Sequence, residues 1–301
     1  MYDTLVAISA HKYIIRKLYL VGFALLIISG FVWWLKVYEN PYNIYWDMLK
    51  NSLETTGVTK HVTEESNNTT LDQYIMFNFG TSNLAHARTS LKNSSGTVTT
   101  ENIGTIQNDY VQYVSVAASS GNKQDFSKVI NKWAMRTVTN DNTNTDPSFF
   151  IQTVVGFDGG NVIPIANLPV ESRSVLLDQL HNDVIFNVSF DKVKQQIVHG
   201  RPIYNYPVSI ELVGYVAFQK AFAKEMGIKA LDAVDPNSYQ GKDAINVQFL
   251  IDGWSHELTG IVYPGVKHTE TFNNYGIRTN VTEPKTTIST QALQALFANT
   301  K

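Results

Sequence analysis

The hydrophobic pattern opens with one long apolar run from Leu18 to Leu35, in which Ser29 is the one weakly polar side chain. At about 1.5 Å per residue, a helix of this length just crosses a bilayer core of roughly 30 Å. Arg16 and Lys17 directly precede the run, and basic residues there favour a cytoplasmic N-terminus. The pattern therefore predicts three parts, a cytoplasmic tail, a transmembrane signal anchor and an extracytoplasmic domain, over residues 1–17, 18–38 and 39–301.

Two other interpretations of the run fit the sequence less well. A cleaved signal peptide needs small residues in an A-x-A-like pattern after the apolar stretch, whereas the sequence here is the bulky, aromatic FVWWLKVYENP. A buried helix of a soluble domain is rarely apolar on every face. We therefore expect a single-pass location in the cell membrane, with the C-terminal domain outside the cytoplasm.

After the anchor, the pattern predicts one amphipathic helix and then strands. Asn40-Pro41 is typical of a helix start, and apolar residues continue at helical spacing as far as Thr55. The period then changes to two, and turn residues recur every 10 to 12 positions. Short segments with this spacing indicate an antiparallel meander. Its predicted strands are residues 58–66, 71–79, 83–92, 96–104 and 108–117.

Helices interrupt a second set of strands. The predicted helices are Asp125–Met135, Pro169–His181, Leu212–Met226 and Thr290–Ala298. The predicted strands are residues 184–190, 193–199, 203–210, 244–252, 254–263, 266–275 and 277–281. Between the two sets, residues 125–182 form a helical insert. It contains a polar loop at 137–146 and an apolar stretch at 148–157 that fits either a helix or a strand. Runs of strands separated by helices indicate an α+β fold, in which a curled antiparallel half-barrel of about ten strands packs on helices.

Composition excludes several kinds of chemistry. The chain has no cysteine, which rules out disulfides, thiolate metal sites, a cysteine nucleophile and an acylated cysteine. Its net charge is −2 and no basic stripe is present, so we expect no nucleic-acid partner. Walker, G-x-S-x-G, H-E-x-x-H and dinucleotide-binding motifs are also absent from the sequence. These observations predict a protein that is not an enzyme and holds no cofactor.

The best polar cluster lies on the last predicted hairpin. His256 follows Asp252 on one strand, and His268 and Glu270 lie on the next. If the Pro264-Gly265 turn sets the register, the two histidines lie at about the same level, as a metal site or an acid/base pair would need. The favoured alternative is ordinary solvated pairing across strands, so we expect no metal, with His256 and His268 as weak candidates.

Short stretches of the chain match a known pattern. The meander contains GTVTTENIGT and NDYVQYVSV, and the C-terminal part contains Ile251-Asp252-Gly253-Trp254-Ser255, then Tyr275-Gly276 and Pro284. In this the chain resembles the curved-sheet envelope carriers, a superfamily that includes the bacterial lipoprotein-localisation carriers and the mycobacterial lipid-binding lipoproteins. The resemblance implies an apolar ligand on the concave face of the sheet. The chain departs from that family in lacking a lipid-modified cysteine and in carrying the insert 125–182.

These features predict a membrane-anchored extracytoplasmic protein that binds a lipid, lipoprotein or other apolar ligand, with the membrane as a partner through residues 18–35. The candidate ligand-binding residues are aromatic and lie on predicted strands: Phe77, Phe79, Tyr113, Phe186 and Phe249. The alternatives are an interaction or sensor module that binds an envelope protein and, less favoured, a metal-dependent hydrolase.

Overall fold

The structure is a computed structural model that describes residues 19, 21–30, 40–80, 83–119, 125–137, 161–228 and 231–299. The chain divides into two compact units, Met1–Trp46 and Asp47–Lys301, and the second unit contains the sheet. The predicted loop at 137–146 and the apolar stretch at 148–157 lie outside the described residues, apart from Thr137.

The predicted signal anchor at 18–38 is contradicted. Within the described residues, no helix combines the length and the hydropathy that crossing a bilayer requires. The single-pass membrane location inferred from the run is therefore wrong, because it depended on a full transmembrane span.

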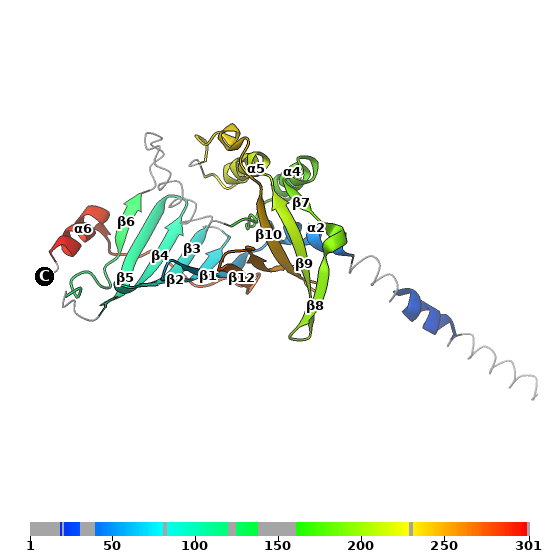
Figure 1. The fold of residues 1–301 in the computed structure, drawn as a ribbon, viewed down its shortest axis with the longest axis horizontal. Coiled ribbons are helices and arrows are strands. Elements are labelled where there is room, and N and C mark those ends of the chain that lie inside the picture. Colours follow the sequence, from blue (N-terminus) through cyan, green and yellow to red (C-terminus); the bar gives the residue numbers. More distant parts are fainter. Residues whose placement is uncertain are drawn as a thin grey trace, which may run out of the picture. The chain divides into compact units, whose positions relative to one another are not determined.

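The second unit is built on one open sheet of 13 strands, so the expected half-barrel of about ten strands undercounted them. The α+β class itself agrees with the structure (Figure 1). One half of the sheet is the predicted meander with a short added strand: β1 (Gly57–Ser66), β2 (Thr69–Asn78), β3 (Leu84–Asn93), β4 (Gly96–Thr105), β5 (Asn108–Ala118) and β6 (Ala134–Thr137).

The remaining strands come mostly from the C-terminal half of the chain: β7 (Phe186–Val188), β8 (Lys194–Val198), β9 (Arg201–Ile210), β10 (Ile245–Asp252), β11 (Leu258–Val262), β12 (His268–Asn273) and β13 (Ile288–Ser289). The described helices are α2 (Pro41–Ser52), α4 (Val170–Asn182), α5 (Leu212–Glu225) and α6 (Thr290–Ala298), with 3-10 turns η3 (Phe190–Lys192) and η4 (Pro236–Tyr239). The strand order is β13-β6-β5-β4-β3-β2-β1-β12-β11-β10-β9-β7, with β8 also paired to β9.

Local sequence explains the regular turns and helix ends. Asn67 and Asn68 both adopt positive φ, at 47° and 64°, which gives the tight two-residue turn that suits the twist of β1 and β2. At the start of α5, the Glu211 carboxylate accepts a hydrogen bond from the Gly214 N–H at 2.7 Å, and Gly227 ends the helix with φ at 75°. The predicted strands of the meander and the helices at 169–181, 212–226 and 290–298 are therefore confirmed to within a few residues.

Two predicted elements are wrong. Residues 125–135 were expected to be a helix, but they form turns, with Asn131 at a φ of 59°, and then enter β6. Residues 277–281 were expected to be a strand, but they run without ladder pairing, and the last strand is β13. Strand β6 pairs with the edge of β5, and β13 pairs with β6 in parallel. These pairings join distant segments, and no local periodicity encodes them.

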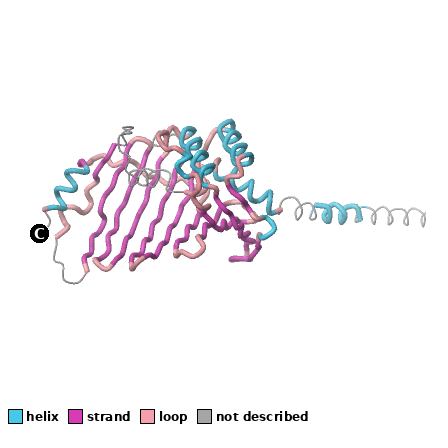
Figure 2. Tube along the Cα trace, turned by 45° about the horizontal axis from the view of Figure 1, so that its top comes forward, coloured by secondary structure: helices cyan, strands magenta, loops and turns pink. Residues whose placement is uncertain are grey.

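Two helices pack on the same face of the sheet, which we call the inner face. Alternation along paired strands places Phe77, Ala85, Asn102 and Val111 on it. Phe222 of α5 borders a narrow gap with Phe77, and α6 packs against Val111 at the other end. In Figure 2 the helices gather at the two ends of the strand array, and among the described residues no helix lies over the middle strands β2–β4.

A buried ion pair lies where the two halves of the sheet meet. Strand β1 pairs with β12 from Thr59↔Asn273 to Glu64↔His268. On the inner face of this pair, Lys60 Nζ lies 2.9 Å from Glu270 Oε2, and the two side chains are 2% and 4% exposed. Burial lowers the pKa of Lys60, with the Glu270 carboxylate opposing that shift. Two charges this deeply buried stabilise the fold only as long as each balances the other.

We predict that Glu270→Leu lowers the free energy of unfolding by about 3–5 kcal/mol, because it leaves the Lys60 ammonium buried without its counter-charge. The double variant Lys60→Met with Glu270→Leu removes both charges and should recover most of that loss. Urea unfolding followed by circular dichroism measures both. A single variant as stable as the unmodified chain would contradict a structural role for the pair.

Candidate functional site

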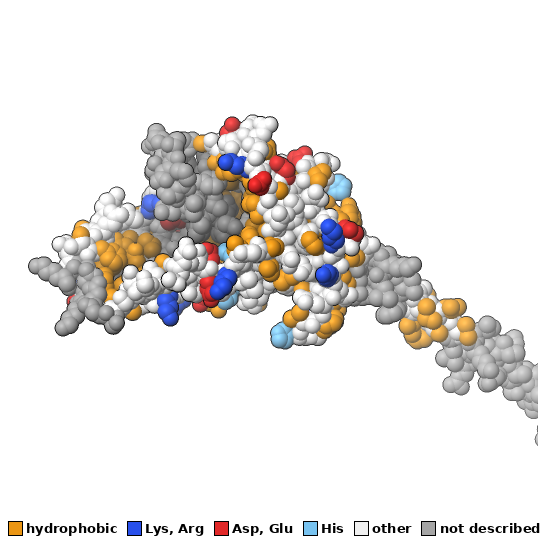
Figure 3. Space-filling model, in the orientation of Figure 1, with side chains coloured by type: hydrophobic (Ala, Val, Ile, Leu, Met, Phe, Trp, Pro, Cys, Tyr) orange, Lys and Arg blue, Asp and Glu red, His pale blue; other side chains and the backbone are white. Residues whose placement is uncertain are grey.

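A hollow lies on the inner face, over β3, β4 and β5. Its volume is about 360 Å³. Ala85 and Ala87 of β3 lie opposite Gly104 and Asn102 of β4, so three of the four paired positions carry a methyl group or no side chain. Thr290, the first residue of α6, closes one side. Hydrophobic surface is visible in this part of the sheet (Figure 3). The hollow therefore comes from small residues on neighbouring strands.

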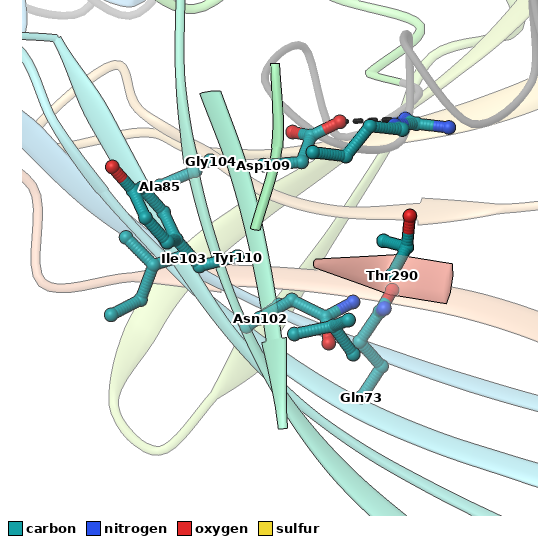
Figure 4. Close-up of a pocket in the computed structure, with 11 residues that line it drawn as sticks. Gln73, Ala85, Asn102, Ile103, Gly104, Asp109, Tyr110 and Thr290 are labelled. Carbon is teal, nitrogen blue, oxygen red and sulfur yellow. Dashed lines mark hydrogen bonds and ion pairs between the residues drawn. The ribbon is translucent and has the colours of Figure 1, made fainter. Parts of the chain in front are cut away.

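Strand alternation decides which side chains enter the hollow. Ile103 and Tyr110 also border it, but they pair with each other and alternate with Asn102 and Asp109 along their strands. Their side chains pack in a separate cluster with Trp133 on the outer face. Figure 4 shows Ile103 and Tyr110 pointing away from Asn102 and Asp109. The backbone of these two residues therefore borders the hollow, while their side chains do not line it.

Polar groups are few in the hollow and have defined positions. At one end, Arg136 Nη2 of β6 lies 2.7 Å from Asp109 Oδ2 of β5 (Figure 4). Burial raises the pKa of Asp109, and the hydrogen bond from Arg136 opposes that shift. On another side, Gln73 Nε2 donates to Thr89 Oγ1 at 2.8 Å. Asn102 Oδ1, in the floor, is buried and has no hydrogen-bond partner among the described residues.

The hollow has the dimensions of a small-molecule pocket. A volume of about 360 Å³ lies within the roughly 300–1,000 Å³ of small-molecule pockets. At the roughly 30 Å³ that a water molecule occupies in the liquid, it admits at least about a dozen non-hydrogen atoms. Among the described residues, no group of three or more His, Asp or Glu side chains is arranged to hold a metal ion. The hollow offers space, an apolar floor and hydrogen-bonding groups at its ends.

The aromatic residues expected to line a ligand site lie outside this hollow. Phe77 and Phe79 stack with ring centroids 6.0 Å apart and border a gap of about 10 Å³ next to α5. Phe186 and Phe249 meet edge to face at 5.9 Å. All four are buried. The chain's own side chains therefore fill the space around these rings.

The fifth expected residue, Tyr113, lies apart from the Phe77–Phe79 and Phe186–Phe249 pairs. Its ring meets that of Phe297 from α6 edge to face, at 4.7 Å. The structure thus distributes the five aromatic residues over three packing sites, and their role in ligand binding stays a prediction. The residues of the hollow were missed because we looked for large side chains. The signal that could have found them is the A-x-A alternation of Ala85 and Ala87 on a strand.

The two histidines of the last hairpin do not face each other. Gly260 pairs with Thr271, so the residue level with His268 is Tyr263, whose ring lies 4.7 Å away. His256 lies before β11, in a turn with φ at 51°, and its Nδ1 contacts Asp47 Oδ2 at 2.8 Å. The expected register was wrong, because residues 253–257 form a turn. Strand β11 therefore begins only at Leu258, after His256.

His268 instead belongs to the charge network of β1 and β12. Its Nε2 lies 3.2 Å from Glu270 Oε1, and its Nδ1 lies 3.0 Å from Glu64 Oε2. The hydrogen bond to Glu270 raises the pKa of His268, against burial, and Glu64 adds to the shift. The same network lowers the pKa of Glu270 despite its burial. The arrangement is a structural ion-pair chain that ends on Lys60.

We predict that His268 makes stability depend on pH in the neutral range. Because its pKa is raised by folding, its contribution is complete below the unfolded value of about 6.5 and disappears as the pH rises through the folded value. The difference in unfolding free energy between the unmodified chain and His268→Gln should therefore shrink between about pH 5.5 and pH 9. Urea unfolding across this range measures it, with His199→Asn in the exposed β8–β9 turn as control. A difference that grows with pH would contradict the assignment.

No protein-family model matches the chain, and no curated protein matches it either. The resemblance to the envelope carriers therefore stays a prediction, and the function must be argued from the site itself.

Proposed function

We propose that the protein is a non-enzymatic binding protein that holds an apolar chain, such as the acyl chain of a lipid or lipoprotein, in the hollow over β3–β5. The observation that carries the proposal is the hollow of about 360 Å³ above Ala85, Ala87 and Gly104. The ligand would lie between α6 and the middle strands, beside the aromatic core next to α5.

Packing energetics support a ligand in this place. Protein interiors reach the density of organic crystals, and an apolar void loses the dispersion contacts that its lining atoms could make. The same inner face is filled by rings where it meets α5. An apolar ligand would restore the missing contacts and would gain about 25 cal/mol for each Å² of apolar surface removed from water. Small residues at paired positions keep that space open.

We predict that Ala87→Phe reduces binding of a fluorescent acyl probe by at least about tenfold, because the ring occupies the floor of the hollow. Probe titration of the full chain measures the change. Ser90→Phe is the matched control, since Ser90 lies on the same strand but on the outer face, paired with Asp72 and Thr99. It should bind the probe as the unmodified chain does.

Two results would reject the proposal. One is an unmodified chain that binds no acyl probe and carries no co-purified lipid in native mass spectrometry. The other is equal loss of binding in Ala87→Phe and Ser90→Phe, which would place the probe elsewhere. A module that binds only a protein partner predicts the first of these results.

A further inference from the structure

A groove of about 490 Å³, which we call the edge groove, lies where β6 meets β13 at one end of the strand order. Ile288 pairs with Ala134 in parallel, and the Ile288 N–H donates to the Trp133 carbonyl at 2.9 Å. In a parallel pair, the residues that precede the two strands lie at the same end. Residues 131–133 and 284–287 therefore lie next to each other and form the two walls of the groove.

The edge groove is separate from the hollow over β3–β5. Side chains alternate along β6, so Trp133 and Arg136, three residues apart, point to opposite faces of the sheet. Arg136 borders the hollow on the inner face. Trp133 lines the edge groove and packs with the cluster on the outer face. A ligand of the edge groove is therefore different from the acyl chain proposed for the hollow.

The edge groove carries positive charge without a counter-charge of its own. Lys132 and Lys285 are exposed and line it, one from each wall. Neither lysine forms an ion pair or a hydrogen bond with a described residue, and none of the described lining residues is acidic. The carboxylate of Glu283 accepts a hydrogen bond from the Tyr110 hydroxyl and does not line the groove. Two ammonium groups that line one space attract an anion.

Part of the lining is apolar and held in place. Trp133, Pro284 and Ile288 are partly buried, and each contributes to the groove. Trp133 packs against the outer-face cluster, and Ile288 packs against the cluster next to α6. At the roughly 30 Å³ that a water molecule occupies in the liquid, the groove admits about sixteen non-hydrogen atoms. It therefore has room for a small organic molecule as well as for its charged group.

We infer that the edge groove binds a small, soluble phosphate monoester of an aromatic alcohol. A phosphate monoester carries a charge of about −1.5 to −2 at neutral pH, which two ammonium groups balance. Its phosphate lies between Lys132 and Lys285, since lysine binds phosphate as a point charge. Its ring lies against Trp133 and Ile288, where apolar surface is removed from water.

Three probes test the inference by isothermal titration calorimetry on the full chain: naphthyl phosphate, naphthol and inorganic phosphate. We expect naphthyl phosphate to bind at least about tenfold more tightly than either of the others, because it alone uses both the charge and the apolar lining. Raising the salt concentration from about 20 mM to about 200 mM should weaken its binding, because the lysines are exposed and their attraction is screened.

The double variant Lys132→Gln with Lys285→Gln should weaken the binding of naphthyl phosphate at least about tenfold, because it removes both ammonium groups. The double variant Lys192→Gln with Lys194→Gln is the matched control. It changes the net charge equally, and its two exposed lysines belong to η3 and β8, outside the groove. It should bind naphthyl phosphate as the unmodified chain does. All four lysines are exposed, so neither double variant opens a cavity in the core.

Three results would overturn the inference. The first is a chain that binds naphthyl phosphate no more tightly than naphthol or inorganic phosphate. The second is an equal loss of affinity in the two double variants, which would assign the binding to net charge. The third is a chain that ignores naphthyl phosphate but sediments with phosphatidylcholine vesicles that contain phosphatidate, which would assign the lysines to a lipid head group. None of these measurements uses the acyl probe, so the proposed function of the hollow stands or falls separately.

Discussion

The pairing of β1 with β12 is the constraint on which the rest of the structure depends. It joins Thr59 to Asn273 and Glu64 to His268, and so unites an N-terminal meander and a C-terminal strand set in one sheet. Closing so long a loop has an entropic cost, which the ladder bonds and apolar burial on both sides must offset. The buried ion pair of Lys60 and Glu270 lies at this junction. Both charges are inside the core, and each balances the other.

One continuous sheet explains how the hollow arises. Its inner face receives α5 at one end and α6 at the other, and both helices bury aromatic or aliphatic side chains against it. The strands between carry Ala85, Ala87 and Gly104, which are too small to fill the space that the flanking helices leave. Two separate sheets would each need their own covering layer. The site is therefore a consequence of sheet continuity together with small residues in the middle strands.

The polar groups of the protein divide into two kinds of environment. A continuous series of ion pairs runs from Glu64 through His268 and Glu270 to Lys60, and it contributes to the pKa shifts of Lys60, His268 and Glu270. The hollow contains the ion pair of Asp109 with Arg136, and the buried Asn102 Oδ1 in its floor has no hydrogen-bond partner among the described residues.

Local periodicity was sufficient for the strands of the meander and for α4, α5 and α6, because their turns, caps and alternation are properties of neighbouring residues. It failed for residues 125–135 and 277–281, whose conformation follows from pairing and packing with distant segments. It also failed for the apolar run at 18–35, where hydropathy alone suggested a membrane span. The sequence could indicate the α+β class, but not which part of the sheet's inner face is open. Only the tertiary structure decided that Phe77 and Phe249 fill the core while Ala87 and Asn102 line a hollow. The physical reason is that small side chains leave a cavity only where the strand register places them side by side and no helix packs over them.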